Sequence, residues 1–522
     1  MSGIVLSASV RQNLLALQNT ASLLATTQNN LATGNKVNTA LDNPTEFFTA
    51  QSLNNRASDI SNLLDGIGNG VQVLQAANTG LTSLQKLVDS AKSIASQVLQ
   101  APTGYTTKSS ISSAVISGAT ANNLLGSSSN NFVTGSAVNN DNTTPVAITG
   151  STHLSGTSSS TSNDLASNIT TGDTLTVNGV VFTFVAGSVS AGTNIGIGDT
   201  VSNLLSAIDA VTGASTTPST VSGGKITLAT GTAQDLTLSG SALAKLGLTA
   251  GTTARNPPAL SGQTLTIAAT GGGTPTNITF GTGASQISTL NQLNTVLAAN
   301  NLQASLSTTG VLTILTTNEA ASSTIGAVSG SSTTSGQAFN GVTASTPVLD
   351  PDSQTTRAGL IAQYNNVMAQ INTTAQDASF NGINLLNGDT LKLVFNETGR
   401  STLNITGVTF NDAGLGLANL TVGTDFLDSN SANKVLTSLD TASTALRSEA
   451  SALGSNLSIV EIRQDFNKNL INVLQTGSSN LTLADTNEEA ANSQALSTRQ
   501  SIAVSALSLA NQSQQSVLQL LR

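Results

Sequence analysis

Residues 436–460 read LTSLDTASTALRSEASALGSNLSIV. Apolar or small side chains recur in this stretch at spacings of three and four, at Leu436, Leu439, Ser443, Leu446, Ala450, Leu453, Leu457 and Val460. This is the heptad pattern of a helix that packs along another helix. The stretch therefore predicts one long helix of a coiled-coil arrangement.

The same spacing recurs near both ends of the sequence. A first run has Val10, Leu14, Leu17, Ala21, Leu24, Gln28 and Leu31, a second has Leu81, Leu84, Val88, Ala91, Ala95 and Val98, and the last has Ile502, Ala506, Leu509, Ser513 and Leu520. Gly34 is expected to end the first helix and Pro102 the second, because glycine favours the left-handed C-terminal conformation and proline lacks an N–H. Long helices are thus expected at both ends.

These helical rows are rich in alanine, serine, glutamine and asparagine, so an isolated pair would be weak and packing against further copies is expected. The alternative is an ordinary amphipathic helix inside a monomeric bundle. The apolar residues up to Leu521 favour burial against something, since chain ends are commonly polar. The side chains expected to form assembly seams are Val10, Leu14, Leu17, Leu24, Leu31, Leu81, Leu84, Val88, Leu446, Leu453, Leu457, Ile502, Leu509, Val517 and Leu520.

The middle of the sequence is β-rich and internally duplicated. Residues 174–184 read TLTVNGVVFTF and predict two strands joined at Asn178-Gly179. A short helix is expected at 201–208 and a strand at 224–228, and a shift of 86 residues finds Ile287, Leu290 and the strand-like 310–314. Two hairpin–helix–strand units are therefore expected near 170–250 and 260–330. The Ser/Thr/Asn/Gly-rich stretches 118–168 and 326–348 are expected to be loop or linker.

The composition excludes several classes of protein. The chain has 522 residues, 18 basic and 27 acidic, and only 9% of all residues are charged. An acidic chain with few, scattered cations is not a nucleic-acid binder. No run approaches the roughly 18 apolar residues of a membrane span, and the first residues do not resemble a Sec signal peptide. The chain has no cysteine, which excludes disulfides and thiolate metal sites.

No arrangement of residues predicts catalysis or a cofactor. His153 is the single histidine and lies in a loop-like stretch, so a surface position is expected. A zincin motif needs two histidines, and the acids at Asp350, Asp352, Glu488 and Glu489 are adjacent in sequence rather than marked as a cleft pair. The glycines at 66–70 and 271–273 lack the context of a phosphate loop. The sequence predicts neither an enzyme nor a bound metal or cofactor.

Both ends of the sequence resemble bacterial flagellin. Residues 26–40, TTQNNLATGNKVNTA, resemble the family's L-S-T-G-x-x-V-N-S-A signature, and residues 65–77, DGIGNGVQVLQAA, resemble its D-G-I-S-x-x-Q-x-A stretch. Residues 510–522, ANQSQQSVLQLLR, are similar to the A-N-Q-x-x-Q-x-V-L-x-L-L terminus. The resemblance covers roughly residues 1–108 and 355–522. Residues 377–386, DASFNGINLL, resemble the segment that follows the second inner helix, so the insert is expected between the first and second inner helices, with a β segment at 391–420.

The resemblance implies an α+β multidomain fold. Long N- and C-terminal helices pack as an antiparallel coiled-coil bundle, and the β-rich insert is duplicated. The expected segments are an N-terminal filament-core helix at 1–43, N-terminal inner helices at 44–108, an outer domain at 109–354, the second inner helix, β segment and C-terminal inner helix at 355–476, and a C-terminal filament-core helix at 477–522.

The resemblance also implies a function. The chain is expected to polymerise with itself into the extracellular flagellar filament used for swimming, with its terminal helices stacking heterologously. The implied partners are the flagellar export apparatus, an export chaperone, and the filament cap and hook–filament junction proteins. Two alternatives stay open: a hook–filament junction protein, which shares the helical ends, and a secreted adhesin whose β units bind glycans.

Overall fold

The computed structural model describes residues 8–188 and 191–520, without the side chains of 517–520. The chain divides into two compact units. The helical unit comprises residues up to Ile94, residues 362–420 and residues from Leu436 onward. The insert unit comprises residues 95–361 and 421–435.

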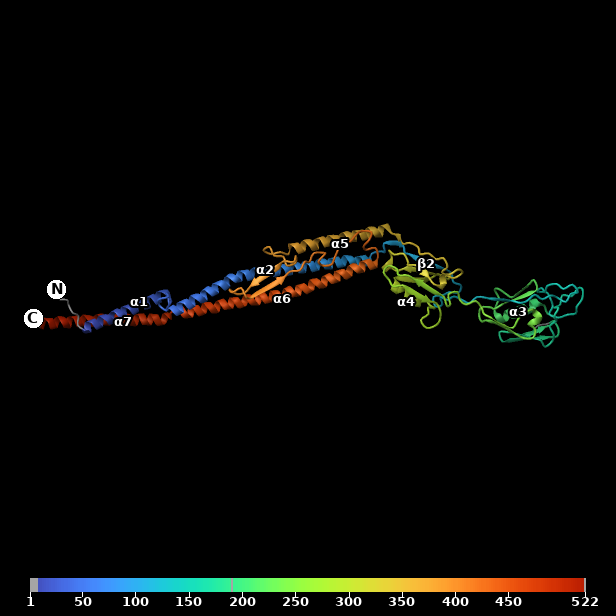
Figure 1. Ribbon diagram of the computed structural model, residues 1–522, viewed down its shortest axis with the longest axis horizontal. Coiled ribbons are helices and arrows are strands. Elements are labelled where there is room, and N and C mark those ends of the chain that lie inside the picture. The colour runs from blue at the N-terminus through green and yellow to red at the C-terminus, as the bar shows by residue number, and fades with distance from the viewer. Residues whose placement is uncertain (1–7, 189–190, 521–522) are drawn as a thin grey trace. The chain divides into compact units, whose positions relative to one another are not determined.

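Five long helices account for most of the helical unit (Figure 1). In chain order they are α1 (Ala8–Thr33), α2 (Pro44–Gln100), α5 (Pro351–Asp377), α6 (Ser429–Thr482) and α7 (Thr486–Leu520). A hairpin of β17 (Thr390–Val394) and β18 (Thr402–Thr406) follows α5, as expected for the β segment. The insert therefore lies in the chain between α2 and α5.

Local sequence signals set the helix ends. Gly34 has a φ of +72° and ends α1 at the expected place, because glycine adopts this left-handed conformation without steric cost. The side chain of Asn43 accepts a hydrogen bond from the N–H of Glu46 at 3.2 Å, and Pro44 takes the first position of α2. From Pro44 the chain forms one uninterrupted helix of 57 residues, where several inner helices were expected.

Two of the glycines inside α2 allow another segment of the chain to approach the helix backbone closely. A Cβ atom at Gly70 would lie 2.4 Å from a methyl group of Leu393 in β17, and one at Gly80 would lie 2.6 Å from the Cβ of Ala378. The segment after α5 therefore packs directly against the α2 backbone. This close approach offsets the entropic cost of glycine in a helix.

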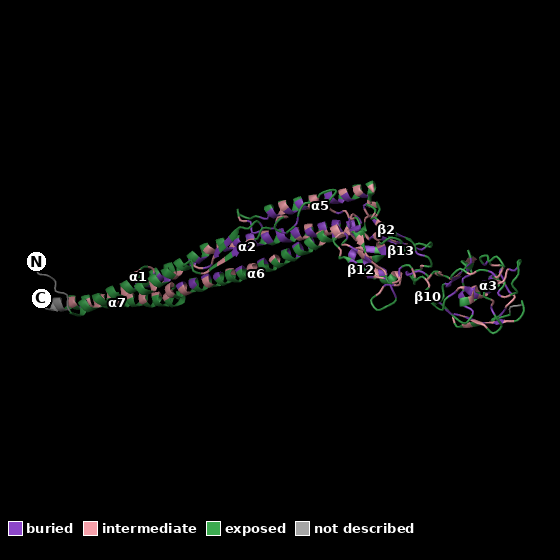
Figure 2. Cartoon of the chain, turned by 45° about the vertical axis from the view of Figure 1, so that its right-hand side comes forward, coloured by how far each residue is buried: buried purple, intermediate pink, exposed green. Residues whose placement is uncertain are grey.

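Helices α2 and α6 pair in antiparallel orientation. Ser478 donates to the carbonyl of Ala50, Gln85 donates to Ser443, and Lys92 Nζ lies 2.5 Å from Asp440, so positions rise on one helix as they fall on the other. Every seventh residue of α6 is buried along this contact, at Leu439, Leu446, Leu453, Val460, Asn467 and Leu474. The heptad row predicted at residues 436–460 is therefore the inner face of α6 (Figure 2).

The insert unit contains two β-rich repeats, as the sequence predicts. The first consists of β3 (Phe132–Thr134), β4 (Thr174–Val177), β5 (Val180–Val185), β6 (Asn194–Gly196), α3 (Val201–Thr212), β7 (Thr220–Ser222), β8 (Lys225–Ala229), β9 (Leu236–Ser239) and β10 (Gly251–Thr253). The second consists of β2 (Ser110–Val115), β11 (Thr264–Ile267), β12 (Thr276–Thr279), α4 (Leu290–Leu297), β13 (Leu302–Leu306), β14 (Val311–Thr316) and β15 (Val328–Ser329). A short pair of β1 (Tyr105–Thr107) and β16 (Val348–Leu349) completes the unit.

The sheets of the two repeats share a common set of strands: β9-β4-β5 corresponds to β15-β11-β12 and β3-β8-β7 to β2-β14-β13, while β10 and β6 extend the first repeat alone. The first has strand orders β10-β9-β4-β5-β6 and β3-β8-β7, and the second has β12-β11-β15 and β13-β14-β2. The predicted turn at Asn178-Gly179 joins β4 to β5 with positive φ at both residues. Two predictions were wrong in detail. Both stretches expected as loop or linker supply a strand, because β3 in 118–168 pairs with β8 and β15 in 326–348 pairs with β11. Ile287 precedes α4, which begins at Leu290.

Equivalent glycines mark the duplication at atomic level. Gly240 and Gly330 have φ of +123° and +118°, and a Cβ at either would lie within 2.4 Å of a carbonyl oxygen, that of Thr174 or Thr264. Each is followed by a serine whose hydroxyl accepts from the N–H of that same threonine. Both repeats therefore build the same turn around the same first strand.

The first repeat is nested within the second. The chain enters through β2, which pairs with β14 of the second repeat, then builds the whole first repeat and returns. Ser129 and Asn256 exchange two backbone hydrogen bonds of 3.1 and 3.0 Å at the point where the chain leaves and returns. The first repeat has its own core around Leu175, Phe184 and Leu204, and the second around Leu265, Phe280 and Ile314.

One buried cation lies in the insert unit. Arg357 is 4% exposed and donates from Nε and Nη2 to the carbonyl of Pro102, at 3.1 and 3.0 Å, and from Nη1 to the carbonyl of Phe426 at 2.6 Å. These carbonyls lie just beyond α2 and just before α6, where helix ends leave polar groups without intrahelical partners. The side chain of Arg357 satisfies them.

Candidate assembly surface

The seam residues expected in the middle of the helical unit are covered by the chain itself. The five side chains at Leu81, Leu84, Val88, Leu446 and Leu453 are all buried, and Leu457 is half-buried. Because α2 and α6 cover each other here, these residues hold the single chain together. A second copy has no access to them.

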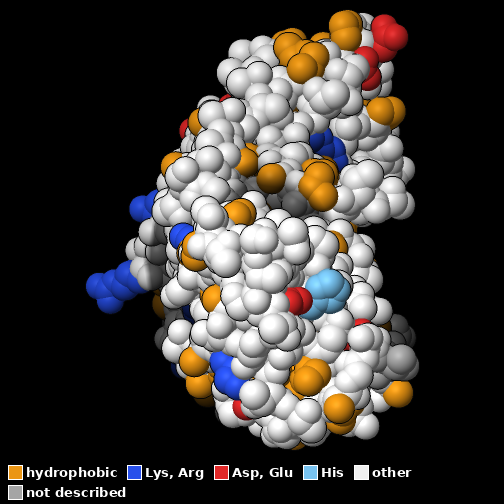
Figure 3. All heavy atoms as spheres, turned by 90° about the vertical axis from the view of Figure 1, so that its right-hand side faces the viewer, with side chains coloured by type: hydrophobic (Ala, Val, Ile, Leu, Met, Phe, Trp, Pro, Cys, Tyr) orange, Lys and Arg blue, Asp and Glu red, His pale blue; other side chains and the backbone are white. Residues whose placement is uncertain are grey.

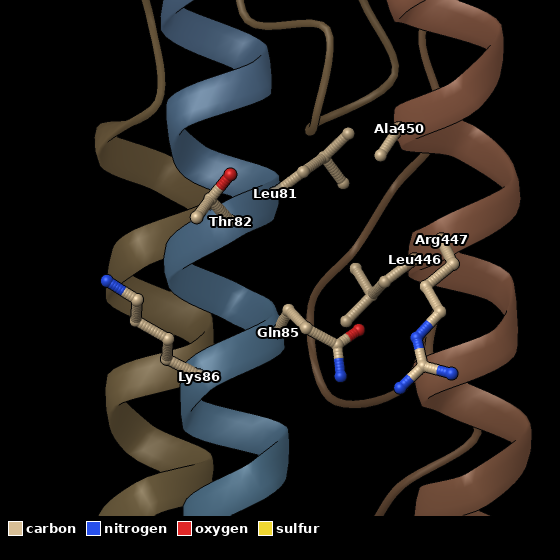
Figure 4. A pocket seen from close by; sticks show the side chains of 7 residues that line it. All are labelled: Leu81, Thr82, Gln85, Lys86, Leu446, Arg447 and Ala450. Carbon is tan, nitrogen blue, oxygen red and sulfur yellow. The ribbon is translucent and has the colours of Figure 1, made fainter.

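A groove interrupts the α2–α6 contact at one level (Figure 4). It has a volume of about 310 Å³ and is lined by Leu81, Thr82, Gln85, Lys86, Leu446, Arg447 and Ala450. Figure 4 shows Gln85 and Arg447 pointing toward one another across it. Gln85 donates to Ser443 at 2.8 Å, while its buried Oε1 has no partner among the described residues. The groove is thus lined by polar as well as apolar side chains beside the seam.

The terminal helices α1 and α7 lie side by side but cover each other thinly. On α7 the face toward α1 is half-buried at spacings of four and three, at Glu489, Ser493, Leu496, Gln500, Ala503, Leu507, Ala510 and Gln514. On α1 only Val10, Leu24, Thr27 and Asn30 are buried, and Asn30 donates to Glu489 at 3.0 Å. Small and polar residues dominate this contact, so it gains little from apolar burial.

The contact face differs from the predicted rows in both helices. On α1 the buried row turns from the predicted Gln28 and Leu31 to Thr27 and Asn30, because the link between α6 and α7 covers that side and donates from Ala484 to the carbonyl of Gly34. On α7 the predicted Ile502 and Leu509 lie on a neighbouring face. Two apolar rows run along α7, and spacing alone cannot show which of them meets α1.

Several large apolar side chains of α1 and α7 remain uncovered (Figure 2). Of the predicted seam residues, Val10 and Leu24 are buried, Leu17 is half-buried, and Leu14, Leu31, Ile502 and Leu509 are exposed, the last two at 63% and 71%. The side chains of Val517 and Leu520 lie outside the described residues. We use the name terminal apolar residues for the exposed set, which is Leu14, Leu15, Leu23, Leu31, Ile502, Val504 and Leu509.

Sequence reasoning missed a further apolar row on α6. Ile459, Ile462, Phe466 and Val473 are all exposed and follow the spacing of three, four and seven. They lie on a different face of α6 from the inner heptad row. A search of the sequence for a second set of apolar positions with the same heptad spacing could have found them.

On the face that Figure 3 shows, charged side chains are few and scattered. His153 is about half exposed, and its Nδ1 lies 3.4 Å from Asp164. Among the described residues, no group of three or more His, Asp or Glu side chains could hold a metal ion, and no helix is long and apolar enough to cross a membrane.

Comparison with known families identifies the helical ends. The model of the bacterial flagellin N-terminal helical region matches residues 5–125, and that of the bacterial flagellin C-terminal helical region matches residues 436–521. Both helical ends of the chain are thus similar to the corresponding regions of bacterial flagellin. Within the insert, a domain of unknown function (DUF1522) matches residues 196–283, across parts of both repeats.

Curated flagellins are similar over limited lengths. Flagellin FljM of Caulobacter vibrioides is 34% identical over 165 residues, which is 31% of this chain and 59% of FljM. A flagellin of Brucella melitensis is 32% identical over 170 residues, 31% of this chain and 60% of the relative. Flagellin A of Rhizobium meliloti is 35% identical over 113 residues, 21% of this chain and 27% of the relative. The chain thus spans less than two thirds of the length of these relatives.

Proposed function

We propose that this chain is the structural subunit of an extracellular bacterial flagellar filament, the propeller of swimming motility. The observation that carries the proposal is the set of terminal apolar residues left uncovered on α1 and α7. The similarity of both helical ends to bacterial flagellin supports it.

The free energy available from these residues is sufficient to drive assembly. Fully burying an exposed leucine or isoleucine stabilises a contact by about 1.5–3 kcal/mol. The terminal apolar residues number seven, so even partial burial of each could offset the cost of ordering and associating one subunit. In the single chain these residues are between 37% and 71% exposed to water.

The helix pair itself needs further contacts. Helices α1 and α7 bury few apolar side chains between them, and long helices gain most of their stability from packing an apolar face. Copies that cover the terminal apolar residues would therefore also stabilise the two helices. In the proposed filament the uncovered face of one copy meets a different surface of the next copy, so that the contact is heterologous and extends without closing.

The same proposal names the partners and the route. Further copies of the chain are the main partner, together with the flagellar export apparatus, an export chaperone, and the filament cap and hook–filament junction proteins. The chain has no cysteine, so no disulfide can form during export in an unfolded state. Catalysis plays no part in this function.

Seeded elongation tests the proposal. Purified chain is mixed with sheared filament seeds and inspected by electron microscopy, beside a truncated chain that ends before Leu496. The double variant Ile502→Asn, Leu509→Asn is compared with the control Ser501→Asn, Ser508→Asn, whose exposed serines directly precede the two targets. We expect long filaments from the intact chain and the control, and none from the truncated chain or the apolar double variant.

The alternative functions predict other results. A hook–filament junction protein would not elongate even with seeds. A secreted adhesin would bind glycans saturably after deletion of both helical ends. Elongation by the apolar double variant at the wild-type rate would show that the terminal apolar residues do not drive assembly.

A further inference from the structure

Helix α6 carries two heptad rows on nearly opposite sides. The inner row is buried against α2. The outer row consists of ten residues, all exposed, at Thr441, Ala445, Ser448, Ala452, Ser455, Ile459, Ile462, Phe466, Asn469 and Val473. A heptad row is the contact face of a coiled coil, and it spans roughly 48 Å here at 1.5 Å per residue. A helix with two such rows is built for two partners, of which the single chain supplies one.

The outer row changes in size along its length. Its first five positions are small and its second half has the large side chains, with Ile462 and Val473 65% and 66% exposed. The small half includes a shallow hollow of about 500 Å³ lined by Thr437, Asp440, Thr441, Thr444, Ala445 and Ser448. The outer row thus has small side chains beside a hollow at one end and large side chains at the other.

We propose that two copies of this chain pair in antiparallel orientation through their outer rows. The row reads with the same spacing in both directions about Leu457. An antiparallel second copy therefore places each position opposite one other position of the same row. Ser455 faces the partner's Ile459, Ala452 faces the partner's Ile462, and Ser448 faces the partner's Phe466. Each large side chain meets a small one, and the partner's Phe466 and the partner's Val473 fill the hollow.

The charges beside the row agree with this pairing. On one flank the charged residues are Glu449 and Arg463, seven positions either side of Asn456. In the antiparallel pair Glu449 faces the partner's Arg463, and the same ion pair forms again across the two-fold axis. On the other flank Asp465, which lies 3.4 Å from Lys468, faces the partner's Ser451, so like charges do not meet. In the single chain Arg463 lies 5.7 Å from the ring of Phe395.

A parallel pair would fit less well. In register it would place Phe466 against the partner's Phe466 and Ala445 against the partner's Ala445, so one end would be crowded and the other empty. Cavities and overpacked side chains both reduce the stability of a contact. The size gradient thus favours the antiparallel pair.

This contact is separate from the filament contact. An isologous pair uses the same patch on both copies and closes after two, whereas the filament needs a contact that continues. The paired state is therefore a property of the unassembled chain, and it holds or fails independently of the proposed filament function.

Sedimentation equilibrium of the unseeded full-length chain tests the pairing, across two decades of concentration. We expect a reversible monomer–dimer equilibrium. Ile462→Glu should weaken it at least tenfold because the carboxylate would face an apolar surface, and the control Gln475→Glu, exposed on another face of α6, should leave it unchanged. Far-ultraviolet circular dichroism of each variant serves as the control for retained helix content.

A charge exchange distinguishes a real ion pair from a structural effect. Glu449→Arg alone and Arg463→Glu alone each create two like-charge pairs and should weaken the dimer, while the double exchange restores opposite charges and the affinity. The chain has no cysteine, so Ser458→Cys, beside the two-fold axis, offers a single thiol, and a short bis-maleimide should join two chains through it. Ser58→Cys on α2 serves as the control that should not be joined.

The results that would overturn the proposal are specific. A chain that stays monomeric at every concentration would overturn it, as would a dimer indifferent to Ile462→Glu and to the charge exchange. If Ile462→Glu abolished seeded filament growth and left the dimer unchanged, the outer row would be a filament contact instead. Failure of filament growth in the wild-type chain would bear only on the proposed function.

Discussion

The same substitution at two leucines should have opposite consequences. Leu84 is fully buried in the α2–α6 contact, and Leu509 is 71% exposed on α7. Leu84→Ala leaves a cavity and should lower the free energy of unfolding of the helical unit by about 2–5 kcal/mol. Leu509→Ala removes a side chain that faces water and should change it by less than about 0.5 kcal/mol.

The exposed leucine should matter only for assembly. Losing the methyl groups of Leu509 from a buried contact between copies costs about 2 kcal/mol, at roughly 0.8 kcal/mol per CH₂ group. At 1.4 kcal/mol per factor of ten, the critical concentration for elongation should rise about 30-fold. Leu84→Ala in a chain that still folds should change elongation much less.

Urea unfolding of the unassembled chain, followed by far-ultraviolet circular dichroism, measures the first effect, and sedimentation of filaments at a series of chain concentrations measures the second. Leu446→Ala, buried on the facing helix, serves as a second example of the buried class. The reasoning would be refuted if Leu509→Ala destabilised the unassembled chain as much as Leu84→Ala, or left the critical concentration unchanged.

Three further predictions concern the insert unit. Deleting residues 130–255 and joining Ser129 to Asn256, which already exchange two backbone hydrogen bonds, should leave the second repeat folded and remove one calorimetric transition; loss of both transitions would contradict the nesting. Arg357→Met should lower the free energy of unfolding of the insert unit by about 3 kcal/mol in urea titrations. The substitution leaves buried carbonyls and the buried carboxylate of Asp428 without the cation. An unchanged urea midpoint would count against this reasoning. Burial alone would raise the pKa of Asp173, but hydrogen bonds from Lys245, the Thr170 N–H and Ser241 outweigh it and hold the pKa well below 3.8. The stability that the ionised Asp173 contributes is therefore present above pH 3.8 and is lost as the pH falls below it. Asp173→Asn should therefore flatten the acid dependence of thermal unfolding, and an unchanged pH profile would contradict the argument.

The sequence predicts most of the helical unit for a physical reason. A long helix that packs on another helix must repeat apolar positions every seven residues, and the row from Leu436 to Val460 shows this directly. Gly34 and Pro102 then mark where α1 and α2 end, because glycine adopts the left-handed conformation and proline has no N–H to continue a helix. The duplication is equally visible, because Asn178-Gly179 and the recurring strands leave local signals.

The surface between copies could not be predicted in the same way. Helix α7 has apolar residues in two registers, and only the position of α1 decides that Leu507 is covered while Leu509 is not. On α6 the obvious inner row hides an outer row of small residues, which carry no hydropathy signal by themselves. The nesting of one repeat within the other depends on the pairing of β2 with β14, a long-range contact that periodicity does not record.

The exposure of position 509 before and after assembly tests the central claim most directly. Because the chain has no cysteine, Leu509→Cys offers one thiol whose rate of maleimide labelling reports its accessibility. The account predicts rapid labelling in the unassembled chain and strong protection in the filament, with a Ser58→Cys thiol on α2 reporting general access to the reagent. Equal labelling of position 509 in both states would show that the filament does not cover the terminal apolar residues, and would contradict the account.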